Sequence, residues 1–256
     1  MAEPAAVVTQ AEIEAGLRAL GLEAGDTALV HSSLRSFGHV EGGPEAVIEA
    51  LIAAVGARGC IVMPALTLGA SECPVVLDAR HSPSTSGAIT EAFRLRPDVR
   101  RSHHPTSSAA AWGWAADELT RHHTDTPCGL ASPYGQVYLR GGWCLFLGAP
   151  WTSNTMFHVA EELVMGPYLR FAEFRDATVV DEDGRTETVA FRRYNCYQSG
   201  VRRDLEAVGA RLEADGLVRT TCIAASACRL VRARDVIGTA CEMLLWHTEE
   251  VVSYDR

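Results

Sequence analysis

The chain has 256 residues, of which 47% are hydrophobic and 21% charged, and its formal net charge is −9 at pH 7. We expect residues 1–256 to fold as a single domain with a sizeable core. An acidic chain is a poor match for nucleic acid or an anionic membrane surface, and no apolar run approaches the ~20 residues needed to span a bilayer. The residues after Met1 lack the basic start and apolar core of a signal peptide, so we expect a cytoplasmic protein.

The N-terminal part of the chain predicts a βαβ unit. Thr9 is typical of a helix N-cap, and the amphipathic stretch after it predicts a helix over 10–20. A strand over 27–31 follows, then a helix over 44–55 that begins with a tolerated proline, then a strand over 60–63. Strand, helix and strand within about 40 residues indicate a parallel pair with a right-handed crossover.

The rest of the chain predicts alternating elements and one hairpin. In chain order we expect a polar loop over 67–86, a helix over 88–96, a strand over 106–111, a helix over 113–122, a strand over 143–148, a helix that carries residues 157–164, strands over 178–180 and 187–191, a helix over 199–214, two strands within 217–232, and a last helix capped by Asp235 that ends near 246. The dipeptide Asp183-Gly184 is a strong hairpin signal. The pattern predicts an α/β fold with a mixed sheet.

The eight cysteines are scattered, and none forms a Cys-x-x-Cys pair. In a chain of this length that usage indicates reduced thiols, several of them small core residues. Cys196 lies in a polar stretch and is the one cysteine that we consider for chemistry. With His158 it defines one alternative function, a thiol-dependent hydrolase, although no nucleophile-elbow sequence surrounds it.

The most informative pair is His158 and Glu161, which are three residues apart on a predicted helix and therefore share one face. A carboxylate beside an imidazole raises its basicity and fixes its tautomer, so the pair suits a general base. The helix follows a strand, where α/β proteins place their sites. The same spacing also occurs in solvated surface pairs. Because no second cluster with ligand spacing accompanies the pair, we expect no metal site.

Two other segments carry polar groups at the ends of predicted strands. The segment 31–34, His-Ser-Ser-Leu, ends the first strand, and its hydroxyls and backbone amides suit a phosphate-bearing or amide-rich ligand. The segment 100–108 combines two arginines, two histidines and four hydroxyl residues, a composition that suits phosphate recognition. The alternative for both is an ordinary solvated turn.

Taken in order, these segments resemble the aminoglycoside 3-N-acetyltransferases and their antibiotic-acetyltransferase relatives. The resemblance covers roughly residues 10–250 and rests on the following stretches: 31–34 (His-Ser-Ser-Leu), Gly42-Gly43, 62–64 (Val-Met-Pro), 101–105 (Arg-Ser-His-His-Pro), Ser132-Pro133, Leu147-Gly148, and Thr155, His158, Ala160 and Glu161 in the spacing Thr-x-x-His-x-Ala-Glu.

The resemblance implies an acyltransferase with a mixed central sheet covered by helices on both faces. It implies acetyl-CoA or another acyl-CoA as co-substrate, His158 as general base and Glu161 as its support. The cofactor-binding residues implied are His31, Ser32, Ser33, Leu34, Arg101, Ser102, His104 and Ser107. Backbone amides near 31–34 would bind the developing oxyanion. The acceptor is a small-molecule amine contacted by Thr67, Glu72 and Asn195, with a homodimer left open.

One departure concerns the acceptor. The aminoglycoside-modifying members hold a polycation with carboxylates after the Val-Met-Pro strand and after the hairpin. Here Glu72 is the first acid of the former segment, whereas the latter contains Arg192 and Arg193. Like charges repel, so a biosynthetic acyltransferase that acts on a non-aminoglycoside amine is the main alternative. The two arginines could equally point to solvent from an edge strand.

Overall fold

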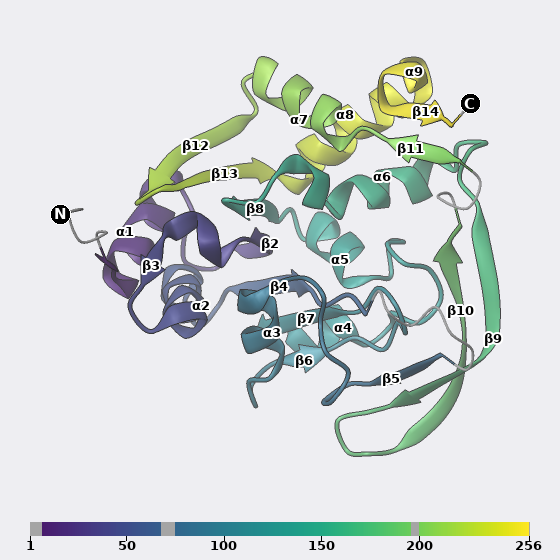
Figure 1. The fold of residues 1–256 in the computed structure, drawn as a ribbon, viewed down its shortest axis with the longest axis horizontal. Helices are drawn as coiled ribbons and strands as arrows, with labels where there is room; N and C mark the ends of the chain where they lie inside the picture. The colour runs from purple at the N-terminus through teal and green to yellow at the C-terminus, as the bar shows by residue number, and fades with distance from the viewer. Residues whose placement is uncertain (1–6, 68–74, 196–199, 256) are drawn as a thin grey trace.

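The computed structural model describes residues 7–67, 75–195 and 200–255. A seven-stranded mixed sheet lies at its centre, with the strand order β12-β13-β8-β2-β4-β7-β6 (Figure 1). Its strands are β2 (Thr27–Ser32), β4 (Cys60–Pro64), β6 (Arg100–Arg101), β7 (Ala109–Gly113), β8 (Trp143–Leu147), β12 (Val218–Ile223) and β13 (Ser226–Arg232). Strand β2 runs parallel to both β4 and β8, and the other neighbours are antiparallel. The predicted mixed sheet and the predicted parallel pair are therefore confirmed.

Helices and shorter strands surround this sheet. The helices are α1 (Gln10–Leu20), α2 (Gly43–Val55), α3 (Ala88–Arg94), α4 (Ala116–Thr120), α5 (Pro133–Leu139), α6 (Met156–Val164), α7 (Leu205–Ala214), α8 (Ala233–Trp246) and α9 (Thr248–Val251), with 3₁₀ turns η1 (Leu34–Phe37) and η2 (Trp151–Ser153). The outer strands are β1 (Val7–Val8), β3 (His39–Val40), β5 (Val76–Asp78), β9 (Phe171–Val180), β10 (Thr186–Tyr194), β11 (Val201–Arg203) and β14 (Val252–Tyr254).

Helices cover both faces of the central sheet because its strands are apolar on both sides. Successive side chains of a strand point to opposite faces, and in β2 Val30 packs with α1, α2 and α3 whereas Leu29 packs with α5, α6 and α8. All five residues of β8 are buried. A strand buried on both faces needs a layer of helices on each side, as Figure 1 shows.

The helix signals of the sequence are confirmed at one end of the chain and wrong at the other. Thr9 caps α1, and its hydroxyl and Glu12 form a capping box. Asp235, in contrast, lies in the first turn of α8, which begins at Ala233 without a side-chain cap. The reason is that β13 runs directly into α8, which leaves no turn in which a capping residue could stand.

Two predicted boundaries are displaced, and one predicted loop contains a strand. The strand predicted over 106–111 begins at Ala109, and the helix predicted from residue 199 begins at Leu205 after the cap Asp204. Residues 201–203 instead form β11, which pairs with β14 at the C-terminal end. The predicted loop over 67–86 contains β5, a strand that we did not anticipate, and residues 68–74 of that loop lie outside the described residues. Helix α5 was not anticipated either.

The predicted hairpin is confirmed, and its two strands extend beyond the predicted residues 178–180 and 187–191. Strands β9 and β10 pair antiparallel around the turn at Gly184, and β5 adds a parallel third strand. Phe191 and Val179 belong to a small separate core beneath this sheet. The hairpin extends along one side of the molecule (Figure 1). At its tip Glu182 accepts the amide of Arg101 on β6, and at its base Tyr194 donates to Glu162 on α6.

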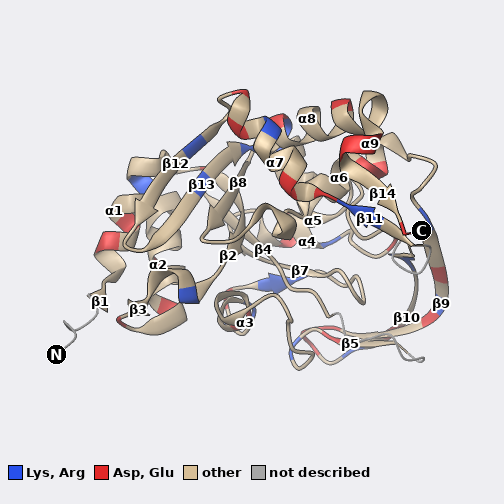
Figure 2. Cartoon of the chain, turned by 45° about the horizontal axis from the view of Figure 1, so that its top comes forward, with Lys and Arg blue, Asp and Glu red and all other residues tan. Residues whose placement is uncertain are grey.

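Charged residues of both signs are interspersed along the helices and strands seen in Figure 2. Among the residues described, no helix has the length and apolar character to cross a bilayer.

Gly209 of α7 provides a test of how α7 packs on η2. An added Cβ at Gly209 would lie 2.2 Å from the indole of Trp151. We expect Gly209→Ala to lower the free energy of unfolding by about 1–3 kcal/mol, the usual cost of overfilling a packed core. Urea denaturation measures this change.

The matched control is Gly238→Ala in α8, where an added Cβ meets nothing within 4 Å. This substitution should stabilise the protein by about 0.5–1 kcal/mol, because alanine loses less backbone entropy in a helix. Similar effects of both substitutions would contradict the packing argument.

Candidate active site

The site forms where β2 and β8 end side by side. Because these strands are parallel and Ser32 pairs with Leu147, their carboxyl ends open at the same edge of the sheet. After β8 the chain passes through η2 and enters α6, where the buried Asn154 accepts a hydrogen bond from the amide of Met156 at 3.1 Å. This local bond fixes the start of α6, so that His158 lies in its first turn.

His158 and Glu161 form the predicted contact. Nδ1 of His158 lies 2.5 Å from Oε2 of Glu161. The Glu161 side chain is 0% exposed and also accepts hydrogen bonds from Tyr168 Oη at 2.8 Å and from Arg203 Nε at 2.6 Å. Burial raises the pKa of Glu161, but the hydrogen bond and charge of His158, together with those of Arg203, outweigh it and leave the pKa below its usual value. Glu161 is therefore a carboxylate held from three sides.

This arrangement selects one tautomer of His158. A carboxylate only accepts hydrogen bonds, so Nδ1 of His158 carries a proton, and in the neutral ring it is Nε2 that has the lone pair. The ring stacks obliquely on Tyr194 at a centroid distance of 5.3 Å, and its side chain is 21% exposed. Nε2 is therefore equipped to take a proton from a ligand in the cavity beside it.

A cavity of ≈ 470 Å³ adjoins His158. It is lined by Val30, His31, Ser32, Ser33, Pro64, Leu66, Thr85, Ser86, Thr90, Ser107, Cys128, Tyr134, Ala149, Pro150, Thr152, Ser153, Thr155, His158 and Tyr194. Hydroxyl groups dominate its polar lining, and none of these described residues is Asp or Glu. Such a cavity suits a ligand with many hydrogen-bonding groups and apolar segments.

Three buried polar atoms of the lining residues have no hydrogen-bond partner among the residues that the structure describes. They are Nε2 of His31, Oγ of Ser32 and Oγ1 of Thr155. An unsatisfied buried polar group costs about 1–3 kcal/mol, so this wall of the cavity gains from a ligand that supplies partners. Burial, together with the charge of His158, lowers the pKa of His31 to about 3, so its imidazole is neutral.

The structure gathers part of the predicted cofactor set at this cavity. His31, Ser32, Ser33 and Ser107 line it with His158. Leu34 begins η1 directly after them and packs partly against the core. The amide of Ser33 donates to the carbonyl of Leu147 at 2.9 Å, so this amide is not available to an oxyanion.

Arg101 does not reach this cavity. Its guanidinium group is buried and donates to the carbonyl oxygens of Ala65 and Ser82 and to the hydroxyls of Thr67 and Ser108. Burial and the nearby charge of Arg94 lower the pKa of Arg101 to about 10. Arg101 thus ties the loop after β4 to the loop after β5, and Thr67 is part of the same tie.

Ser102 and His104 are likewise buried and bonded within the protein. Ser102 Oγ contacts His123 Nδ1 at 2.9 Å. Nδ1 of His104 accepts the amide of Ser107 at 3.0 Å, and Nε2 donates to the carbonyl of Arg192 at 3.0 Å. Burial lowers the pKa of His104 to about 4. The cofactor roles of Arg101, Ser102 and His104 stay predictions, and none of the three lines the cavity.

The acceptor residues are only partly described. Asn195 follows β10, and its backbone N–H donates to the backbone carbonyl of Arg170 at 2.9 Å. Glu72 and Cys196 lie outside the described residues, so the contacts proposed for them stay predictions.

Arg192 lies on the outside of the hairpin, away from the cavity lining. It forms a bidentate ion pair with Asp125, with distances of 3.0 and 2.8 Å. Arg193 packs over the ring of Phe174. Neither arginine is among the residues that line the cavity, so neither side chain forms part of its wall.

Sequence reasoning missed Tyr194, Tyr168 and Arg203. Tyr194 borders the cavity, and its hydroxyl donates to Glu162 at 2.6 Å. Tyr168 and Arg203 bind Glu161 from outside α6. Tyr168 directly follows Gly166-Pro167, a dipeptide typical of a helix end, which gives a weak clue, whereas nothing local to Arg203 marks it. Within the described ranges, no group of three or more His, Cys, Asp or Glu residues is arranged to hold a metal ion.

Comparison with known proteins identifies relatives over nearly the whole chain. The profile of the family described as Aminoglycoside 3-N-acetyltransferase matches residues 29–245. The chain is 34% identical to the SPbeta prophage-derived aminoglycoside N(3')-acetyltransferase-like protein YokD of Bacillus subtilis, covering 91% of this chain and 90% of that protein. It is also 34% identical to aminoglycoside N(3)-acetyltransferase VII of Streptomyces paromomycinus, covering 90% and 89%.

Solved structures share the fold. Aminoglycoside acetyltransferase AAC(3)-Xa superimposes with a TM-score of 0.83 at 30% identity, covering 93% of both chains. AAC-IIIb, solved as a binary complex with CoASH, gives a TM-score of 0.81 at 25% identity over 93% of this chain and 97% of that one. A variant of AAC(3)-IVa in complex with a gentamicin gives 0.78 at 30% identity, covering 95% and 90%. The α/β fold expected from the sequence is confirmed.

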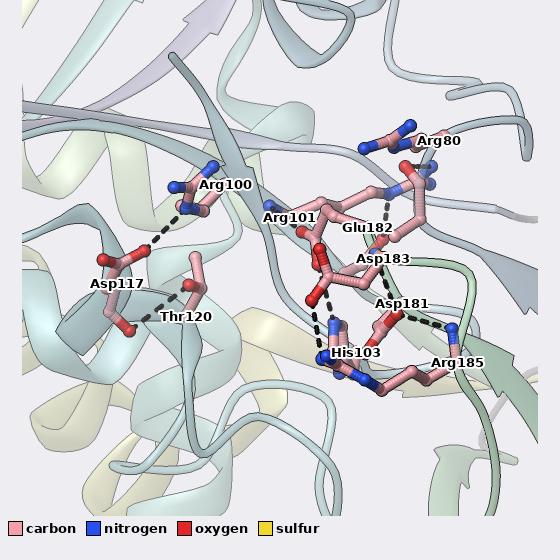
Figure 3. A network of polar contacts seen from close by, with 12 residues as sticks. Arg80, Arg100, Arg101, His103, Asp117, Thr120, Asp181, Glu182, Asp183 and Arg185 are labelled. Atoms are coloured by element: carbon pink, nitrogen blue, oxygen red, sulfur yellow. Dashed lines mark hydrogen bonds and ion pairs between the residues drawn. The ribbon is translucent and has the colours of Figure 1, made fainter. Parts of the chain in front are cut away.

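The segment around Arg101 also contains a pH-sensitive contact with the hairpin tip (Figure 3). Glu182 accepts the amide of Arg101 at 3.3 Å and contacts Nε2 of His103 at 3.4 Å. This hydrogen bond raises the pKa of His103 in the folded protein above 6.5. Stability from a raised histidine pKa is fully present below the unfolded value and is lost as pH rises through the folded value.

We therefore expect Glu182→Gln to lower the Tm more at about pH 6 than at about pH 9, since His103 loses its charge in between. Thermal unfolding of both proteins at the two pH values measures the difference. Asp183→Asn on the same turn is the control, because its ion pair with Arg185 is exposed and contributes little. A Tm difference that does not vary with pH would refute the contact.

Proposed function

The chain belongs to the aminoglycoside 3-N-acetyltransferase family, and on that premise we propose that it transfers an acetyl group from acetyl-CoA directly to an amine, with His158 as general base and Glu161 as its support. The observation that carries the proposal is the dyad itself: a buried carboxylate 2.5 Å from an imidazole whose other nitrogen is left for a ligand. The dyad stands beside the cavity large enough for substrate groups.

Acetyl transfer to an amine gives His158 and Glu161 separate roles. An acceptor amine is protonated at neutral pH and must lose a proton before it attacks a carbonyl. His158 Nε2 takes that proton, and the lone pair that it frees forms the C–N bond. The C–S bond then breaks, the imidazolium protonates the departing thiolate of coenzyme A, and the remaining excess proton of the amide nitrogen passes to solvent. A general base in this role contributes about 10²–10⁴-fold. Glu161 keeps the imidazole in the required tautomer and stabilises the imidazolium. A thioester is already activated, so no covalent acyl-protein is needed.

The cavity wall formed by β2 and the loops near it fits the co-substrate. Coenzyme A supplies the acetyl thioester on a pantetheine arm that carries amide groups. The unpartnered His31 Nε2, Ser32 Oγ and Thr155 Oγ1 offer hydrogen bonds to such groups, and Ser107 lines the same cavity. We assign these residues to the co-substrate in preference to Arg101, whose donors are occupied.

For the acceptor we propose an amino sugar, with an aminoglycoside as the first candidate. The names of the relatives support this choice, and the argument against it from Arg192 loses force because that arginine pairs with Asp125 outside the cavity. A single-amine acceptor of biosynthetic origin is the second candidate. It is favoured by one observation: the described residues that line the cavity include no carboxylate to hold a second ammonium group.

The dyad is tested by His158→Ala, which should lower kcat for acetyl transfer by about 10²–10⁴-fold because the base is lost. Glu161→Gln should cost less, since that residue orients the imidazole and does not accept the acceptor's proton. Release of the CoA thiol with a panel of amines measures both. The control is His122→Ala, an exposed histidine outside the cavity.

Folding and co-substrate binding are checked by the rise in Tm that coenzyme A produces, because a ligand that binds the folded chain stabilises it by mass action. His158→Ala should keep this rise. Undiminished turnover in His158→Ala would remove the dyad from the mechanism, and no transfer by the wild-type protein to any amine would refute the proposed function.

The acceptor surface is tested by the double substitution of Arg192→Glu and Arg193→Glu. Because these side chains do not line the cavity, we expect the ratio of kcat/KM for a kanamycin-like acceptor to that for a single-amine acceptor to stay unchanged. Assays at low and high salt complete the test, since binding of a polycation by carboxylates weakens with added salt. A selective gain for the multiply charged acceptor would place these arginines at the acceptor and favour the single-amine candidate for the native protein.

A further inference from the structure

Glu161 has a second strong partner that belongs to a distant part of the chain. Arg203, the last residue of β11, donates from Nε to Oε1 of Glu161 at 2.6 Å, while His158 occupies Oε2. The Arg203 side chain is 2% exposed and that of Glu161 is 0% exposed. The two residues thus form a buried ion pair directly behind the proposed base, with Tyr168 as a third donor to the same carboxylate.

We propose that Arg203 is a positioning residue that balances the charge of Glu161 and thereby keeps His158 unprotonated and able to accept a proton at neutral pH. The inference deepens the proposed function and rests on it. It assigns to β11 a part in the chemistry that its position in the sequence does not suggest.

The argument is one of charge balance. A buried carboxylate beside an imidazole stabilises the imidazolium. Without another counter-charge, Glu161 would stabilise the imidazolium of His158 more strongly and so oppose its action as a base. With Arg203 in place, Glu161 and Arg203 together are neutral, and a proton on His158 gives the three groups a net positive charge. His158 therefore releases its proton more readily, and the hydrogen bond to Nδ1 still orients the ring.

The other described groups around His158 do not replace this charge. His31 from β2 is neutral, since its pKa is about 3. Tyr194 from β10 is also neutral, because burial and the neighbouring acids raise its pKa well above the usual value. Glu162 is the remaining acid, and it is held by Tyr194 Oη and by the amide of Cys128. Arg203 is the cation in direct contact with the dyad's carboxylate, and its guanidinium also stacks over Tyr194 at 5.5 Å.

The test follows the titration of the His158 ring by proton NMR, with its signal identified by its loss in His158→Ala. In Arg203→Met the midpoint of His158 should move to higher pH by about one unit or more, because the nearby positive charge that opposes a proton on the imidazole is lost. The acid limb of the kcat/KM profile should move with it. Arg203→Lys keeps the charge and should keep the midpoint near that of the wild-type protein.

Removal of one partner of a buried ion pair can prevent folding, so Arg203→Gln provides a second neutral variant whose amide can still donate to Glu161. Glu161→Gln provides the opposite sign: with Arg203 unbalanced, the midpoint should fall. Tyr168→Phe, which removes a hydrogen bond to the same oxygen without removing a charge, should move the midpoint least.

A midpoint that stays in place in the neutral Arg203 variants, or that rises in Glu161→Gln, would overturn the inference. This outcome differs from failure of the proposed function, which would appear as absence of acetyl transfer in the wild-type protein whatever the titration shows.

Discussion

The carboxylate of Glu161 is fully buried, and a buried charge is tolerated only where donors and an opposite charge surround it. Its partners come from three segments: His158 on α6, Tyr168 after that helix, and Arg203 on β11. Strand β11 is in turn held by β14. The C-terminal segments must therefore close against α6 before this charge is satisfied, which makes the dyad and the packing of the chain's end one structural unit.

The central sheet places the two imidazoles on one cavity. Because β2 is parallel to β8, the loop that follows β2 and the helix that follows β8 emerge at the same edge. His31 and His158 are far apart in sequence, yet they lie close enough for the charge of His158 to lower the pKa of His31. Burial keeps His31 neutral, whereas His158 sits at the cavity with a carboxylate behind it. The same residue type thus has two different environments in a single site.

The segment 101–104 shows that a motif can be typical of a family although none of its residues lines the cavity beside His158. The composition of the segment is typical of a phosphate site, yet the Arg101 side chain donates to carbonyls and hydroxyls of the protein itself. Ser102 and His104 are buried in similar networks. These residues join the loops after β4 and β5 to the hairpin. His104 also accepts the amide of Ser107, and in this way the segment holds a residue that lines the cavity.

Local signals in the sequence sufficed to predict the capped helix α1, the parallel β2–α2–β4 unit, the hairpin turn, and the His158–Glu161 contact, which follows from helical spacing. Contacts between distant segments were needed to fix the start of α7, the strand β11, the partners of Arg101 and Arg192, and the ion pair of Arg203. The physical reason is the range of the interactions. Periodicity and capping act within a few residues, whereas a buried charge takes its partner from whichever segment the fold brings within reach.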